Sequence, residues 1–173
     1  MFNDQFPDLA SFVFHMQSTM DKVEVIQQPL WDTVIYPSEG TERLTAFVFP
    51  IGSEGKTQHD TNMVLSACLP MPQAFYINSI VLASIDSIPY NVLRNGRLEL
   101  MIGTKPYFNF APMAALCTLE EGLTTMAHKI EPGLGIDSGQ NFCVEMRWIR
   151  ALRLKQDAKI RVQLNGWFFR AVV

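Results

Sequence analysis

The chain has 173 residues, of which 48% are hydrophobic and 18% are charged. This length and composition predict one globular domain with a buried core and argue against disorder. The net charge of −3 argues against a dedicated nucleic-acid-binding protein, and no stretch approaches the roughly twenty apolar residues of a membrane-spanning helix.

Residues 1–22 carry an apolar stripe with helical spacing. Its members recur at three- and four-residue steps and are Phe6, Leu9, Val13, Met16 and Met20. The stripe predicts a short amphipathic helix or arm ahead of the main domain, residues 23–173. Such a helix caps its own domain, docks on a neighbouring subunit or lies on lipid. Because no Lys or Arg precedes Lys22, capping or docking is favoured over lipid.

Beyond Lys22 the apolar period changes to two, which is typical of β-strands. Proline and glycine separate three short predicted strands at 23–28, 31–36 and 43–49. The polar, glycine-containing segment 52–61 predicts an exposed loop. The apolar run that follows predicts a further strand at 62–69.

The middle of the chain contains two clearer strand patterns. Residues 74–85 are apolar and rich in β-branched side chains, which favours a strand buried on most of its surface. Residues 96–103 alternate, and the preceding Asn95-Gly96 predicts a hairpin turn. Residues 118–130 fit either a short helix or a strand after a turn at Gly122.

The last third returns to alternation after a glycine-rich segment, 131–139, that we interpret as a surface turn. Residues 141–149 place Phe142, Val144, Met146 and Trp148 on one face, with Glu145 and Arg147 opposite. In the closing stretch the side chains of Ile160, Val162 and Leu164 are expected to face inward. Gly166 predicts a bulge or a close backbone approach, after which Trp167 and Phe169 rejoin the core.

These elements indicate an all-β domain of eight to ten short strands in a sandwich or barrel. Because the chain ends on an apolar strand with no polar tail, we expect that strand to lie in the middle of a sheet.

Reactive side chains show no catalytic or metal-binding spacing, so we predict no enzyme, no cofactor and no metal. His15, His59 and His128 are widely separated, although His59-Asp60 in a polar loop leaves a weak metal site open. The three cysteines, Cys68, Cys117 and Cys143, lie apart in apolar runs and predict buried, inert thiols. Residues 131–139 lack the GK[ST] ending of a phosphate loop.

Charge is distributed unevenly along the chain. Residues 1–60 hold nine acidic and three basic residues, whereas residues 147–161 hold six basic residues and one acidic residue. The two clusters are either solvated faces or complementary surfaces through which copies associate head to tail. The second reading assigns Arg150 and Arg153, with Phe12 and Met16 of the arm, to a subunit interface.

Three segments together carry a family resemblance: NGRLELMIG after a long buried strand, EPGLGIDSGQNFCVEMRW, and the terminal RVQLNGWFFRAVV. The chain resembles the small major capsid protein of icosahedral, membrane-containing phages whose shell uses two single jelly-roll proteins. The resemblance spans most of residues 60–173 and is one of pattern and length.

That resemblance implies an eight-stranded jelly roll, homodimers, co-assembly with a larger capsid protein and contact with an internal membrane. The expected location is the virion capsid, after synthesis in the host cytoplasm, with no specific nucleic-acid partner. The alternative from the residues themselves is a jelly-roll binding module for carbohydrate, in which Trp31, Trp148 or Trp167 would stack on the sugar.

Overall fold

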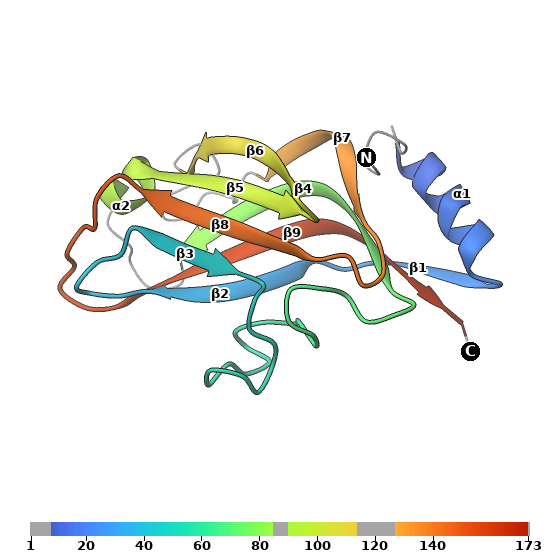
Figure 1. Ribbon diagram of the computed structural model, residues 1–173, viewed down its shortest axis with the longest axis horizontal. Coiled ribbons are helices and arrows are strands. Elements are labelled where there is room, and N and C mark those ends of the chain that lie inside the picture. The colour runs from blue at the N-terminus through green and yellow to red at the C-terminus, as the bar shows by residue number, and fades with distance from the viewer. Residues whose placement is uncertain (1–7, 85–89, 114–126, 173) are drawn as a thin grey trace.

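The computed structural model describes residues 8–84, 90–113 and 127–172, and it is mostly β. Within these ranges two short helices accompany two antiparallel sheets that face each other (Figure 1). In chain order the elements are α1 (Leu9–Thr19), β1 (Val23–Gln27), β2 (Leu30–Tyr36), β3 (Arg43–Ala46), β4 (Ala74–Ser84), α2 (Tyr90–Asn95), β5 (Gly96–Ile102), β6 (Lys105–Pro112), β7 (His128–Ile136), β8 (Phe142–Trp148) and β9 (Ala158–Ala171).

The first sheet is built around the C-terminal strand. β1 and β2 pair one after the other along one side of β9, and β4 pairs along its other side, with β7 beyond it. The second sheet has the order β3-β8-β5-β6. The expectation that the chain ends on a central strand is confirmed.

Strand pairing is nested along the chain. The pairs are β2 with β9, β3 with β8, β4 with β7 and β5 with β6, all antiparallel. The two halves of the chain therefore run side by side like one long hairpin. The pairs β4–β9 and β5–β8 then join this folded ribbon into two sheets.

The core lies between the sheets and follows the predicted alternation. On β8 the side chains of Phe142, Val144 and Met146 are buried together with Trp148, and on β9 those of Ile160, Val162 and Leu164 are buried. Glu145 and Arg147 lie on the opposite face of β8, as predicted. The period of two thus selected the inward face correctly on both strands.

Gly166 is a place of close backbone approach, as predicted. A Cβ at this position would lie 1.9 Å from the carbonyl oxygen of Tyr76 on β4. The bulge, however, lies on β4, where the register shifts between Ile77 and Ser79. Because β9 itself keeps its alternation, Phe168 packs on the main core. Trp167 and Phe169 lie on the outer face instead, which corrects the prediction for these two residues.

Helix α1 covers that outer face, so the capping alternative is the one observed. Asp8 begins the helix by accepting a hydrogen bond from the Ser11 amide at 2.7 Å. Phe12 packs edge-on against Phe169 and also contacts Tyr76. Gly135 of β7 leaves room for the Phe12 ring, because a Cβ there would lie 2.5 Å from it.

Four sequence predictions need correction or fall outside the described residues. Residues 62–69 form no strand, since the segment bends at Ala67, which has a φ of 54°. Asn95-Gly96 joins α2 to β5 and makes no hairpin. Most of the supposed surface turn at 131–139 belongs to β7, and only residues 138 and 139 turn. Of the ambiguous segment 118–130, residues 128–130 are strand, and 118–126 lie outside the described residues.

Candidate functional site

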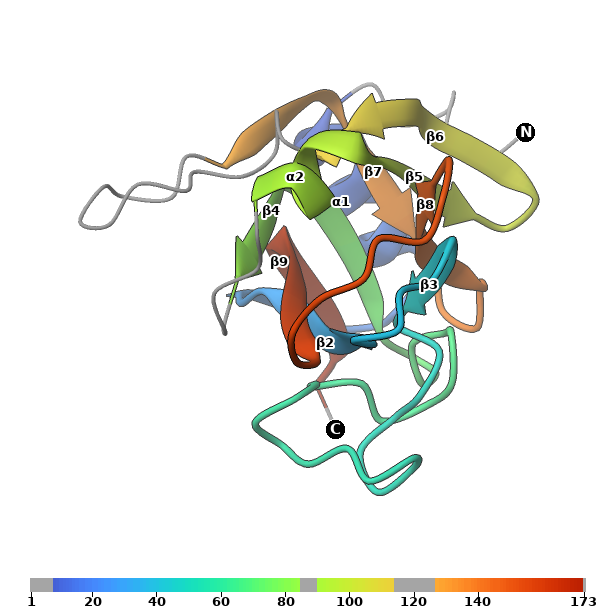
Figure 2. The same cartoon turned by 90° about the vertical axis from the view of Figure 1, so that its left-hand side faces the viewer.

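Residues 47–73 connect β3 to β4 through a long segment without a named strand, which we call the β3–β4 loop. It projects from the sandwich beside β2 and β3, as two perpendicular views show (Figures 1 and 2). Structureless connections of this length are uncommon in compact domains and are often functional. The loop is therefore the first place to look for a site.

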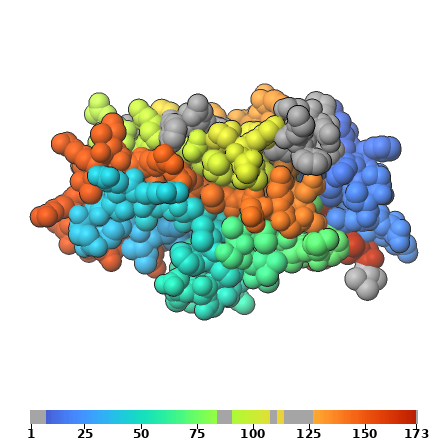
Figure 3. Space-filling model, viewed as in Figure 1, coloured from blue at the N-terminus to red at the C-terminus, as the bar shows by residue number. Residues whose placement is uncertain are grey.

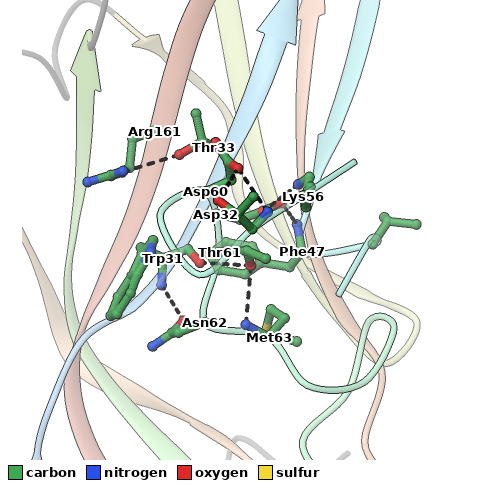
Figure 4. Close-up of polar contacts among 12 residues, drawn as sticks. Trp31, Asp32, Thr33, Phe47, Lys56, Asp60, Thr61, Asn62, Met63 and Arg161 are labelled. Carbon is green, nitrogen blue, oxygen red and sulfur yellow. Dashed lines mark hydrogen bonds and ion pairs between the residues drawn. The ribbon is translucent and has the colours of Figure 1, made fainter. Parts of the chain in front are cut away.

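A buried carboxylate holds the loop to the body. Asp32 of β2 is 0% exposed. Its carboxylate accepts a hydrogen bond from the Phe47 amide at 2.6 Å and forms an ion pair with Lys56 at 2.5 Å (Figure 4). Burial raises the pKa of the Asp32 carboxyl, although the bonds from Lys56 and Phe47 act in the opposite direction. Asp32 thus fixes two points of the loop, its first residue Phe47 and Lys56.

A second set of bonds ties the loop to the outer edge of β2. The Thr33 amide donates to the carbonyl oxygen of Asp60 at 2.7 Å, and the Trp31 amide donates to the side chain of Asn62 at 2.9 Å (Figure 4). The Thr61 hydroxyl donates to the carbonyl oxygen of Trp31. Residues 60–62 therefore lie antiparallel to β2 and form a single bridge with it, between Thr61 and Asp32.

The outer side of the loop is apolar. Among the described residues ten large hydrophobic side chains are exposed, and half of them belong to this loop, which we call the apolar rim: Phe49, Ile51, Val64, Leu65 and Met71. Met63 and Leu69 point inward and are buried, so the loop is anchored while its rim faces solvent. The space-filling view shows the loop as a projection on the surface (Figure 3). Clustered exposed apolar residues mark interaction surfaces.

A groove of about 660 Å³ lies between β2, β3 and the first part of the loop. Apolar residues and cations both line it. The full set is Thr33, Val34, Ile35, Arg43, Leu44, Thr45, Val48, Phe49, Glu54, Gly55, Lys56, Asp60 and Lys159. Phe49 belongs to both the groove and the rim, so the groove borders the rim at this residue.

The outer face of the second sheet carries a compact charge network. Glu145 is buried and receives hydrogen bonds from both Arg43 and Arg147. Glu99 lies directly across from it on β5 and is also buried. Burial and the neighbouring Glu145 raise the pKa of the Cys143 thiol, which disfavours a reactive thiolate.

The four residues predicted for a subunit interface fall in two places. Phe12 and Met16 lie on α1 and are buried against the chain's own first sheet, in a cluster with Tyr76 and Phe169. Arg150 and Arg153 are exposed on the connection between β8 and β9. Ile149 beside them is 95% exposed, which makes this connection a second candidate contact.

Part of the acidic cluster lies beside the basic cluster. The β2–β3 connection carries Glu39 and Glu42, and it is hydrogen-bonded to the β8–β9 connection through the Leu154 amide and the Ser38 carbonyl at 2.8 Å. Acidic and basic side chains therefore share one end of the molecule.

The other candidate groups are dispersed. His59 is exposed, and the neighbouring Asp60 carboxylate is bonded to the amide and hydroxyl of Thr57. No group of three or more potential metal ligands occurs in residues 8–84, 90–113 and 127–172. Cys68 and Cys143 are free and half-buried, not fully buried as predicted, and Cys117 lies outside the described residues.

The three tryptophans do not form one platform. Trp148 is buried against Tyr36 and donates its indole N–H to the carbonyl oxygen of Val92 at 2.7 Å. Trp31 and Trp167 are half-buried on the outer face of the first sheet. Any sugar-stacking role is therefore limited to these two.

No protein-family model matches the chain, and the comparison with curated proteins finds no significant match. Among the described residues no helix is both long and apolar enough to cross a lipid bilayer.

Sequence reasoning missed Asp32, although a signal was present. The alternation in WDTVIY places Asp32 in the same register as Val34 and Tyr36, both of which are buried. A lone carboxylate at an inward strand position predicts a buried polar anchor, because an isolated charge cannot remain in a core unpaired. The partners Lys56 and Phe47 are distant in sequence and gave no such signal.

Proposed function

We propose that the chain is a structural virion protein, a major capsid protein that self-associates and co-assembles with a larger capsid protein into an icosahedral shell. The observation that carries the proposal is the nested strand pairing. If β1 and β2 are counted as one strand interrupted at Pro29, eight strands in two facing sheets remain. This arrangement fits a jelly roll, the architecture of many viral capsid domains.

Two surface features support a role in assembly. The apolar rim is held by an anchored loop, so a partner would meet an ordered surface and little ordering entropy would be lost on binding. Among the described residues β3, β6 and β7 each pair on one side only, and such edge strands can pair further or be covered by a neighbour. A shell supplies neighbours at fixed positions to cover such features.

The direct test measures association. Light scattering coupled to size-exclusion chromatography should show a dimer of the 173-residue chain by itself. Larger particles should form only when a second, larger β-rich capsid protein is added. A protein that remains monomeric under both conditions would contradict the proposal.

Site-directed changes sharpen that test. Replacing Val64 and Met71 by serine should abolish particle formation with little change in stability, because both side chains are exposed in the subunit at 67% and 79%. The matched control is Phe14→Ser, which alters an equally exposed side chain on α1. Charge reversal at Arg150 and Arg153 should also impair assembly, with Lys22→Glu and Arg94→Glu as the charge-matched control.

A carbohydrate-binding module is the second candidate, and one observation favours it. Between Trp31 and Trp167, the side chains of Gln163, Asn165 and Ser79 form a hydrogen-bonded row on the same outer face. Amides held in this way can bind sugar hydroxyls while an indole stacks on the ring. Titration of a monomeric protein with a glycan panel distinguishes the two, since saturable binding lost in Trp31→Ala would favour the module.

A further inference from the structure

Strand β1 lies at one end of the molecule, beside α1 and the last residues of β9 (Figure 1). It pairs with β9 along one side, and among the described residues no strand pairs with its other side. Helix α1 packs on the face of the first sheet, in a cluster with Tyr76 and Phe169. Val25 of β1 remains 45% exposed. This end of the first sheet therefore has an uncovered edge.

The hydrogen-bond pattern identifies the backbone groups that point to this free edge. The Val172 amide donates to the carbonyl oxygen of Lys22 at 3.0 Å, and the same register continues along β1 and β9. Because bonded and non-bonded residues alternate in an antiparallel ladder, the even-numbered residues of β1 bond to β9 as Lys22 does. The odd-numbered residues direct their N–H and C=O groups to the free edge, and these are Val23, Val25 and Gln27. Within residues 8–84, 90–113 and 127–172 no hydrogen bond reaches these groups.

The other edge strands are protected against pairing with another molecule. Natural proteins protect such edges with proline, with lysine or other charged residues, or by covering them. β3 begins with an arginine, β6 carries a lysine and two prolines, and β7 carries a lysine and a proline. The edge of β2 is bridged by residues 60–62 of the β3–β4 loop.

β1 has none of these protections. Its sequence, VEVIQ, contains no proline, lysine or arginine, and its three aliphatic residues are β-branched, the type that strands favour. Its single charged residue, Glu24, is paired with Arg170 of β9 at 2.7 Å, so β1 carries no unpaired charge. An open, neutral edge of this kind is a template for a strand of another molecule.

The order of residues in β1 fits pairing with a second copy of itself. If two β1 strands pair antiparallel around a two-fold axis at Val25, this residue faces its own copy and Val23 faces Gln27. All three N–H and all three C=O groups of each edge then find partners. Glu24 lies opposite Ile26 in this register. If Val23 faced Val25 instead, the two copies of Glu24 would lie opposite each other, which is destabilising.

We propose that the chain forms a two-fold homodimer in which the β1 edges of two copies pair antiparallel about Val25 and join the two first sheets into one. Such an interface is isologous, the commonest kind in soluble oligomers. A five-residue edge is small, so we expect a dissociation constant in the micromolar range. The proposal names the self-contact of the shell function and rests on that function for its purpose, but the dimer is measured without assembly.

Hydrogen exchange of the full chain, resolved by amide in NMR, tests the contact directly. The amides of Val23, Val25 and Gln27 should exchange about threefold more slowly at about 1 mM chain than at about 50 µM, because mass action raises the dimer fraction. The amides of Glu24 and Ile26 are bonded to β9 in the monomer and in the dimer. They are the internal control, and their exchange should not depend on concentration.

Substitutions at Val25 test the two-fold register. Val25→Lys and Val25→Glu each place two like charges opposite each other across the axis. In sedimentation velocity each variant should dimerise about tenfold more weakly than the wild type, since repulsion adds to the loss of an aliphatic pair.

Mixing the two charge variants provides the rescue. An equimolar mixture should recover most of the wild-type affinity, because unlike charges then meet across the axis, and this recovery also shows that both variants fold. Val25→Thr is the matched control. It keeps the β-branched shape and the outward N–H, so it should dimerise nearly as the wild type does.

Two results would overturn the proposal. One is exchange at Val23, Val25 and Gln27 that does not slow as the concentration rises. The other is a mixture of Val25→Lys and Val25→Glu that associates no better than either variant alone. Particle assembly without β1 pairing would remove this inference and leave the shell function, whereas a β1 dimer that never forms particles would do the reverse.

Discussion

Strand β9 and the β3–β4 loop acquire order in different ways. β9 alternates apolar and polar residues and pairs along both sides, so ladder bonds and core burial fix every residue. The loop has no ladder beyond one bridge and is fixed by individual side chains, above all by Asp32. The conformation of β9 is thus held by many weak, repeated contacts, whereas that of the loop depends on a few side chains.

The difference predicts where single substitutions do most damage. In β9 the most sensitive position is Gly166, where the backbone of β4 leaves no space for a side chain. For the loop it is Asp32 of β2, which anchors the loop. The changes below test this contrast, from the largest expected effect to the smallest.

Gly166→Val should have the largest effect, a loss of about 3 kcal/mol in the free energy of unfolding, the upper end of the usual cost of overpacking. The added Cβ would meet the carbonyl oxygen of Tyr76, and neither backbone can move without breaking the β4–β9 pairing. Urea denaturation followed by circular dichroism measures it. Gly139→Ala is the comparison, because that turn has open space and only its φ of +70° opposes a side chain, at a cost of about 1–2 kcal/mol. A loss there as large as that of Gly166→Val would contradict the argument.

Asp32→Ala should cost about 2–3 kcal/mol, since it leaves the Phe47 amide unpaired and Lys56 without its counter-ion. Unlike Gly166→Val, it should expose mainly the β3–β4 loop. Limited proteolysis should therefore cleave within 47–73 before the sandwich unfolds. Asp157→Ala removes an exposed carboxylate that accepts from the Ser38 amide, and it should leave the loop uncut.

Tyr36→Phe should cost about 1 kcal/mol, the usual value for a hydroxyl bonded in a protein interior. The Tyr36 hydroxyl donates to the carbonyl oxygen of Leu152 at 3.1 Å and accepts from the Leu152 amide at 2.9 Å. It therefore holds the β8–β9 connection to β2. Thermal unfolding of Tyr107→Phe, on β6, provides a comparison that should show almost no change.

The smallest effect is a pH dependence of stability that has opposite signs at Asp32 of β2 and Asp60 of the β3–β4 loop. Because burial raises the pKa of Asp32, folding favours its protonated form. The stability of the wild type relative to Asp32→Asn should therefore fall as the pH rises from about 4 through the raised pKa.

For Asp60 the hydrogen bonds from Thr57 lower the pKa, so its contribution is present above its ordinary value and is lost on acidification. The stability of the wild type relative to Asp60→Asn should fall as the pH drops below about 4. Urea midpoints measured from pH 3 to 7 for both variants test the pair, and slopes of the same sign would contradict the assignment.

Much of the fold could be predicted because alternation reports directly which face of a strand is buried. Phe142 to Trp148 on β8 and Ile160 to Leu164 on β9 were placed correctly on that basis. Residues 62–69 have similar composition but form no strand. Their burial is divided between inward Met63 and Leu69 and exposed Val64 and Leu65, a pattern that no period describes.

The candidate site could be predicted only in part. A polar, glycine-containing loop was expected at 52–61, and an interface was expected at Arg150 and Arg153, which are exposed. The apolar rim was missed because three of its five residues, Phe49, Val64 and Leu65, were assigned to strands at 43–49 and 62–69. The groove was missed because it needs two strand edges that lie side by side only in the folded chain.

By itself the sequence determined which residues form the β-rich body, since the apolar period is a local property that survives in any arrangement of the strands. Only the tertiary structure decided the order of the strands and the burial of Phe12 of α1 against Tyr76 and Phe169. It alone also brought Lys56 to Asp32 and joined the acidic and basic connections at one end. These outcomes depend on contacts between residues far apart in the chain, which no local pattern encodes.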